Sequence, residues 1–170
     1  MENNQRIASL TLTDTASTTT FIDDPVHNKA FHERFAQSFE TASWETILEN
    51  IKKQPFPFFV GIDQTPDNQA MWEMAYEIIK IGNRSAIADF IRSFYTDPDP
   101  KVEKLQAITC PTLILVGEKD TLFLEPSRLM ADNIPGATLH ILEGAGHMLA
   151  IERPEQVTCL IRNFLQAHPV

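Results

Sequence analysis

The second half of the chain alternates short apolar runs with amphipathic segments, and this order constrains the fold more than any other feature. Residues 110–117, CPTLILVG, form a continuous apolar run with proline at its entrance and glycine at its exit, which is typical of a parallel strand buried on both faces. Residues 138–144, TLHILEG, indicate a second strand. Amphipathic helices are indicated over residues 125–134 and 153–168. Strand, helix, strand, helix predicts an α/β fold with right-handed parallel crossovers.

The first hundred residues follow a different pattern. Residues 7–13, IASLTLT, indicate one more strand. From about residue 26 to residue 100, apolar residues recur at helical spacing and no strand pattern interrupts them. One segment rich in proline and phenylalanine, QPFPFFVG at residues 54–61, is expected to be a loop between helices. The pattern therefore predicts a run of amphipathic helices inserted after the first strand.

Two residues capable of acid–base chemistry follow the second and third predicted strands. Asp120 lies in LVGEKDTLF, and His147 lies in LEGAGHMLA. The carboxyl ends of parallel strands meet at one edge of a sheet, where ligands and catalytic groups gather, and neighbouring strands lie only about 4.8 Å apart. An aspartate there can accept the Nδ1 proton of a histidine and stabilise the imidazolium that forms when Nε2 takes a proton. Either residue alone is typical of a turn, but the pair at consecutive strand ends predicts a catalytic arrangement.

These segments carry a family resemblance. CPTLILVGEKD, followed by PGATLHILEGAGHMLAIERPEQV, resembles the last strands of an α/β-hydrolase, a family in which nucleophile, acid and histidine follow one another along the chain. The resemblance implies that Asp120 is the catalytic acid and His147 the base. It also implies that residues 1–25 and 101–170 form part of the hydrolase core, with a small parallel sheet of about three strands, and that residues 26–100 form a helical cap.

A cap of this kind covers an apolar pocket above the acid and the base. Most aromatic and methionine side chains in the helical run are expected to be core residues at helical spacing, and a minority are expected to line the pocket. The residues predicted to contact substrate are Phe56, Phe58, Phe59, Trp72, Leu122 and Met148. The substrate implied by the resemblance is a small, largely apolar ester-like or carbonyl compound.

The nucleophile that the family requires does not occur in the sequence. The family carries it on a Gly-x-Ser-x-Gly elbow upstream of the acid, and the glycines that precede the strand of the acid, Gly61 and Gly82, belong to no such elbow. The chain is therefore expected to supply the Asp–His part of a triad and to be inactive alone. Whether the nucleophile is Ser, Asp or Cys, and which bond is cleaved, stay open. Asp14, after the first strand, is an alternative acid, although a role in a turn is favoured.

A function without catalysis is the alternative. A truncated hydrolase-like chain would expose an edge of its first strand and apolar faces, which favours self-association or use as an interaction module. The expected partners are thus a small-molecule substrate, an amino-terminal half supplied from elsewhere, or a second copy of the chain.

Composition excludes several other classes. The formal net charge of −9 disfavours nucleic acid and anionic membrane surfaces as partners. No apolar run approaches the roughly 20 residues that cross a bilayer, and the amino terminus does not resemble a secretory signal. The two cysteines, Cys110 and Cys159, lie far apart without metal-binding spacing, so a cytoplasmic protein without metal or other cofactor is expected.

Overall fold

The computed structural model describes residues 6–17, 25–93 and 101–169, without the side chains of residues 25–28 and of Phe56. Its strands are β1 (Leu10–Thr13), β2 (Thr112–Gly117) and β3 (Thr138–Leu142). Its helices are α1 (Pro25–Thr41), α2 (Trp44–Lys53), α3 (Phe56–Asp63), α4 (Gln69–Ile81), α5 (Arg84–Ser93), α6 (Val102–Gln106), α7 (Leu124–Asn133), α8 (Leu149–Glu152) and α9 (Pro154–Ala167). Within these ranges, no helix combines the length and the apolarity that crossing a membrane requires.

The three strands form one parallel sheet in the order β1-β2-β3. Ile114 in the middle of β2 pairs with Leu12 of β1 on one side and with Leu139 of β3 on the other. Every residue of β2 is buried, as expected for a central strand whose two faces are both covered. The predicted α/β fold with a small parallel sheet is therefore confirmed.

Alternation along β2 divides the core of this region into two layers. Leu113 and Leu115 pack in one apolar cluster with Val157 and Phe164 of α9. Ile114 points to the opposite face, because successive side chains in a strand alternate, and packs in a second cluster with residues of α6 and α7. The apolar spacing of α9 read from the sequence thus corresponds to the helix face that covers the sheet.

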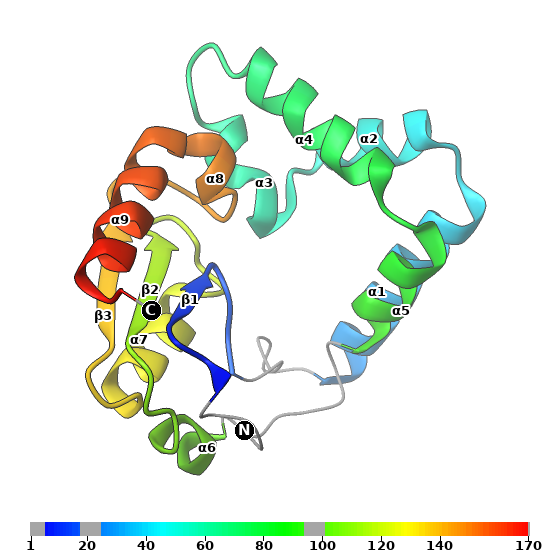
Figure 1. Cartoon of the computed structure of the whole chain (residues 1–170). Coiled ribbons are helices and arrows are strands. Elements are labelled where there is room, and N and C mark those ends of the chain that lie inside the picture. Colours follow the sequence, from blue (N-terminus) through cyan, green and yellow to red (C-terminus); the bar gives the residue numbers. More distant parts are fainter. Residues whose placement is uncertain (1–5, 18–24, 94–100, 170) are drawn as a thin grey trace.

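The five helices α1–α5 have an apolar cluster of their own. All the buried residues of this cluster lie between Ala36 and Ile91. Figure 1 shows these helices extending away from the sheet, with α3 next to α8. Met148 and Ile151, which lie beside and within α8, pack against this helical cluster. The helical run is therefore joined to the sheet through the segment that follows β3.

The expectation of a loop over residues 54–61 is wrong. Most of this segment is helix α3, which begins at Phe56 and has Pro57 within its first turn. Proline is tolerated there because the first backbone N–H groups of a helix have no partner inside the helix. The correction matters for the site, because α3 carries Phe58, Phe59 and Gly61.

Candidate active site

Asp120 lies in a tight turn directly after β2. Its backbone N–H donates to the carbonyl of Gly117 at 3.1 Å, and its carbonyl accepts from Leu124 at the start of α7. The carboxylate is fully buried, and its Oδ1 accepts the backbone N–H of Phe123 at 3.2 Å. The second carboxylate oxygen, Oδ2, faces the loop that follows β3. The end of the strand and the start of the helix together hold the carboxylate in one orientation.

His147 lies on the loop that follows β3, and that loop is fastened to the Asp120 turn. Gly144 adopts φ of 65°, a left-handed conformation that glycine adopts without steric penalty, and its N–H donates to Glu118 Oε2 at 2.9 Å. The carbonyl of Ala145 accepts the N–H of Lys119 at 2.8 Å. These two hydrogen bonds connect the loops after β2 and β3 just before Asp120 in one loop and His147 in the other.

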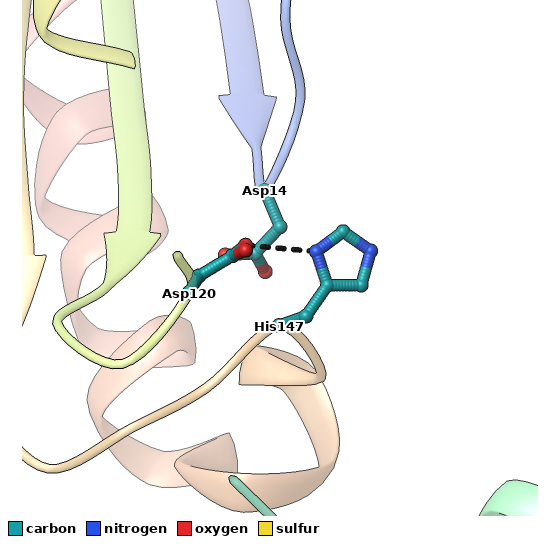
Figure 2. Close-up of side chains that lie close together, drawn as sticks. All are labelled: Asp14, Asp120 and His147. Carbon is teal, nitrogen blue, oxygen red and sulfur yellow. Dashed lines mark hydrogen bonds and ion pairs between the residues drawn. The ribbon is translucent and has the colours of Figure 1, made fainter. Parts of the chain in front are cut away.

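The side chains of Asp120 and His147 meet as the sequence predicts (Figure 2). Nδ1 of His147 lies 2.8 Å from Oδ2 of Asp120, and the side chains are 17% and 1% exposed. A buried carboxylate at this distance favours the tautomer in which Nδ1 carries the proton. That tautomer leaves a lone pair on Nε2, on the side of the ring that points away from Asp120. The arrangement is suited to a general base.

Asp14 brings a third titratable group to the same place. It follows β1 with φ of 45°, and its Oδ1 accepts the N–H of Gly117 at 3.3 Å. Burial, followed by the negative charge of Asp120, raises the pKa of Asp14 to about 8, against the hydrogen bonds from backbone N–H groups of Gly117 and Leu149. Asp14 is therefore predominantly protonated at neutral pH, whereas Asp120 hydrogen-bonds the histidine.

Among the described residues, these three side chains also form a group that could hold a metal ion. One oxygen or nitrogen atom from each of Asp14, Asp120 and His147 lies within 4.8 Å of the others. The histidine nitrogen nearest the carboxylates, however, is already engaged with Asp120 at a hydrogen-bond distance. The geometry is that of a proton-transfer pair more than that of a metal site.

Aromatic side chains flank the imidazole. The ring centroids of Phe58 and Phe123 each lie 4.7 Å from that of His147. Beyond them a cavity of about 510 Å³ extends from His147 to helices α1, α4 and α5. The cavity is lined by Asp14, Thr15, Ala16, Phe35, Phe39, Ile51, Phe58, Phe59, Ile78, Ile79, Gly82, Ile87, Phe90, Ile91, Ser93, Phe123, His147 and Met148. Its wall is therefore mainly apolar, and Asp14 and His147 are the titratable residues in it.

The structure places the predicted substrate residues in different environments. Phe58, Phe59 and Met148 line the cavity. Among the described residues, the lining includes neither Trp72 nor Leu122. Trp72 is buried behind the wall and stacks on Phe59 with ring centroids 5.7 Å apart. The side chain of Phe56 lies outside the described residues.

Several site residues were not singled out from the sequence. Phe123 follows Asp120 by three positions, and its backbone N–H donates to Asp120. Only the folded turn shows that its ring also lies against the ring of His147. The contributions of Phe39, Ile87 and Phe90 come from helices read as amphipathic, with no local signal to separate a cavity-lining position from a core position. Whether such a residue lines the cavity or the core depends on how the helices pack together, which the periodicity of one helix does not reveal.

Solved structures share this fold over almost the whole chain. The structure of MenH from S. aureus matches 95% of the chain and 60% of its own length, with a TM-score of 0.76 and 21% sequence identity. A thermophilic esterase from Thermogutta terrifontis matches 98% of the chain and 58% of its own length, with a TM-score of 0.67 and 26% identity. The chain has the fold of the α/β-hydrolase superfamily, as a part of that fold. The resemblance drawn from the sequence is thereby confirmed.

Curated relatives match shorter parts of this chain. A poly(3-hydroxyalkanoate) depolymerase of Ectopseudomonas oleovorans is 46% identical over 63 residues, which is 36% of the chain and 22% of the relative. A proline iminopeptidase of Saccharolobus solfataricus is 32% identical over 90 residues, which is 53% of the chain and 27% of the relative. No protein-family model matches the chain. The chain thus spans about a quarter of the length of these curated relatives and about 60% of the matched structures.

Proposed function

We propose that the chain supplies the acid–base pair and the substrate pocket of an α/β-hydrolase that acts on a small, largely apolar ester-like or carbonyl substrate. The observation that carries this proposal is the 2.8 Å contact between Nδ1 of His147 and the buried Oδ2 of Asp120, together with the mainly apolar cavity that His147 lines. Asp120 and His147 are the proposed catalytic residues. The nucleophile is proposed to come from outside these 170 residues, because no serine elbow occurs in the sequence.

In the proposed reaction, Nε2 of His147 removes a proton from the nucleophile or from water as that group attacks the substrate carbonyl carbon. Asp120 holds the imidazole in the required tautomer and stabilises the imidazolium by accepting the Nδ1–H. The same Nε2 then gives the proton to the leaving group as its bond to the carbonyl carbon breaks. Where a side chain is the nucleophile, a water molecule deprotonated by Nε2 then cleaves the acyl-enzyme in the same way, and the histidine ends unchanged. Developing negative charge on the carbonyl oxygen is proposed to be stabilised by donors that accompany the nucleophile.

The substrate class follows from the cavity wall. Phe58, Phe59 and Met148 offer apolar surface next to His147, so an acyl or alkyl group can be desolvated there while its carbonyl lies near Nε2. Contact of substrate with Phe56, Trp72 and Leu122 stays a prediction, with Trp72 proposed to act by supporting Phe59. The thermophilic esterase among the similar structures supports an ester-like substrate, although its own substrate is a property of that protein.

The proposal includes a division of the chain. Residues 1–25 and 101–170 are proposed to belong to the hydrolase core and residues 26–100 to a cap, since helices α1–α5 bury an apolar cluster of their own. A cytoplasmic location is also proposed, because Cys110 and Cys159 are both free thiols.

The test compares two forms of the protein in an assay of p-nitrophenyl butyrate hydrolysis. The 170-residue chain alone should show background turnover, whereas the product of its own gene, expressed with the upstream DNA in place, should be active if that DNA encodes the nucleophile. In that active form, His147→Ala and Asp120→Asn should each lower kcat by about 10³-fold or more. Asp132→Asn, at an exposed position on α7, serves as the matched control. Robust turnover by the 170 residues that survives His147→Ala would contradict the proposal.

A further inference from the structure

Glu152 is a buried carboxylate beneath the loop that carries His147. Its side chain lies at the end of α8 and the residue is only 3% exposed. Oε2 accepts the backbone N–H of Gly146 at 2.7 Å, and Oε1 accepts the backbone N–H of Met148 at 3.0 Å. One carboxylate therefore binds the peptide groups on both sides of His147. Hydrogen bonds to an ionised acceptor are about twice as strong as those between neutral groups.

Helix α3 closes the other side of this carboxylate. A Cβ atom at Gly61 would overlap Glu152 Oε2, and a Cβ atom at Gly146 would lie 2.8 Å from the backbone of Gly61. Glycine at both positions is what allows α3, the histidine loop and the carboxylate to lie in contact. Neither glycine has a positive φ, so close approach is the reason for glycine here.

These contacts go beyond the capping of a short helix. A side chain that reaches back to the first N–H groups of its own helix is a common local device, and the bond to Met148 alone would be that. The bond to Gly146 extends past the helix to the residue before the histidine. Together with the bond from Gly144 to Glu118, it secures the loop at three peptide groups around the imidazole.

We propose that Glu152 is a positioning residue that holds His147 in hydrogen-bonding register with Asp120. The effect of Glu152 on hydrolysis rests on the proposed function, whereas its effect on the position of the His147 imidazole does not. If both bonds to the carboxylate are lost, the loop can rotate and Nδ1 no longer faces Oδ2. A displacement of about 1 Å at a catalytic group can lower the rate by on the order of 100-fold.

The experiment reads the state of His147 directly in the 170-residue chain, by ¹⁵N NMR of the imidazole nitrogens. Glu152→Gln keeps the size of the side chain but directs an NH₂ group at one of the two backbone donors. Gly61→Ala keeps the glutamate at position 152, but its added methyl group displaces the carboxylate from the two backbone donors. Both variants should reduce the fraction of His147 that carries its proton on Nδ1 and bonds Asp120. Glu155→Gln, at an exposed position on α9, should leave that fraction unchanged.

Each outcome decides the inference. If either variant folds, as judged by circular dichroism and a cooperative melt, and His147 keeps its Nδ1–H bond to Asp120, the inference is wrong. If both variants fail to fold, the wild-type chain decides it through scalar couplings between the amide nitrogens of Gly146 and Met148 and the Glu152 carboxylate carbon. Detection supports the inference, and their loss from a well-resolved spectrum overturns it. A positive NMR result without hydrolysis in any form of the protein would overturn only the proposed function.

Discussion

Asp14 and Asp120 bring two carboxyl groups to the ends of neighbouring parallel strands, with one oxygen of each within 4.8 Å of the other. Burial and the charge of Asp120 raise the pKa of Asp14 to about 8 from the 3.8 that we take for the unfolded chain. Between these two values the folded protein holds a proton that the unfolded chain releases. The free energy of unfolding therefore decreases as pH rises through this window and becomes constant above it.

The Asp14→Asn variant should remove this pH dependence, because an amide does not ionise. Between pH 5 and pH 8, wild type should lose on the order of 2 kcal/mol more stability than the variant, a value reduced for the partial exposure of Asp14. Urea unfolding at the two pH values measures the difference. Equal pH profiles for the two proteins would show that Asp14 ionises normally in the folded state.

Gly117 at the end of β2 allows the loop after β3 to lie in close contact with the backbone of β2. A Cβ atom there would overlap the carbonyl oxygen of Gly146 and lie 2.5 Å from that of Ala145, both of them backbone atoms that cannot move aside alone. We expect Gly117→Ala to lower the free energy of unfolding by roughly 2 kcal/mol or more and to displace His147.

Gly136→Ala is the comparison for this prediction. Gly136 has φ of 74°, and a Cβ atom there would meet nothing within 4 Å, so its substitution should cost only the backbone strain, about 1 kcal/mol. Urea denaturation ranks the two variants, and NMR of His147 should change only in Gly117→Ala. An equal or larger loss of stability at Gly136 would contradict the crowding at Gly117.

Phe58 contributes both to the cavity wall and to the surroundings of His147. Phe58→Ala should weaken the binding of a non-hydrolysable ketone analogue of a butyrate ester by about tenfold, since the ring is one of two aromatic rings that flank the imidazole. Isothermal titration calorimetry with the 170-residue chain measures this. Ile81→Ala removes an apolar side chain that is 84% exposed, and its binding should match wild type. Unchanged affinity in Phe58→Ala would place the ligand elsewhere.

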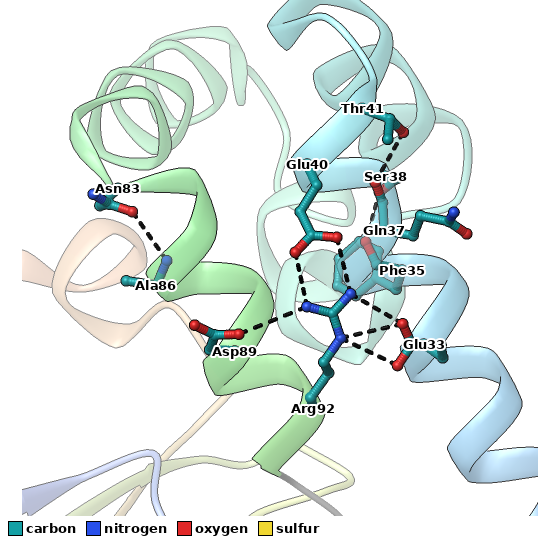
Figure 3. A network of polar contacts seen from close by, with 10 residues as sticks. All are labelled: Glu33, Phe35, Gln37, Ser38, Glu40, Thr41, Asn83, Ala86, Asp89 and Arg92. Atoms are coloured by element: carbon teal, nitrogen blue, oxygen red, sulfur yellow. Dashed lines mark hydrogen bonds and ion pairs between the residues drawn. The ribbon is translucent and has the colours of Figure 1, made fainter.

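Arg92 links helices α1 and α5 by paired charges (Figure 3). Its guanidinium donates to Glu33 and Glu40 of α1 at 2.9–3.1 Å and lies 3.7 Å from Asp89. The hydrogen bonds from Arg92 lower the pKa of both Glu33 and Glu40. Since α1 and α5 carry Phe39 and Ile87 of the cavity wall, this network holds one side of the pocket together.

We expect Arg92→Ala to increase amide hydrogen exchange in α1 and α5 while α9 stays unaffected. High salt should reduce the difference from wild type, because exposed ion pairs are screened. Arg128→Ala removes a comparable exposed pair with Glu125 on α7 and should leave α1 and α5 unchanged. Exchange in α1 that does not respond to Arg92→Ala would show that apolar packing alone joins the two helices.

The apolar periodicity and the titratable residues after two strands were sufficient to predict the central part of the fold. The apolar run of β2 and the spaced apolar residues of α9 are local patterns, and local patterns survive in the linear sequence. The same holds for the approach of Asp120 and His147, because parallel strands end at a common edge. Helix α3 was missed because its start contains two prolines, Pro55 and Pro57, and prolines are typical both of loops and of the first turn of a helix.

By itself, the sequence determined that a parallel α/β sheet would carry a carboxylate and an imidazole on consecutive loops. Only the tertiary structure decided that Asp14 would be held protonated beside them, that Phe58 and Phe123 would flank the imidazole, and that Glu152 would bind both sides of its loop. The physical reason is that burial and close backbone approach depend on which distant segments pack together. Such contacts leave no periodic signal in the residues that make them.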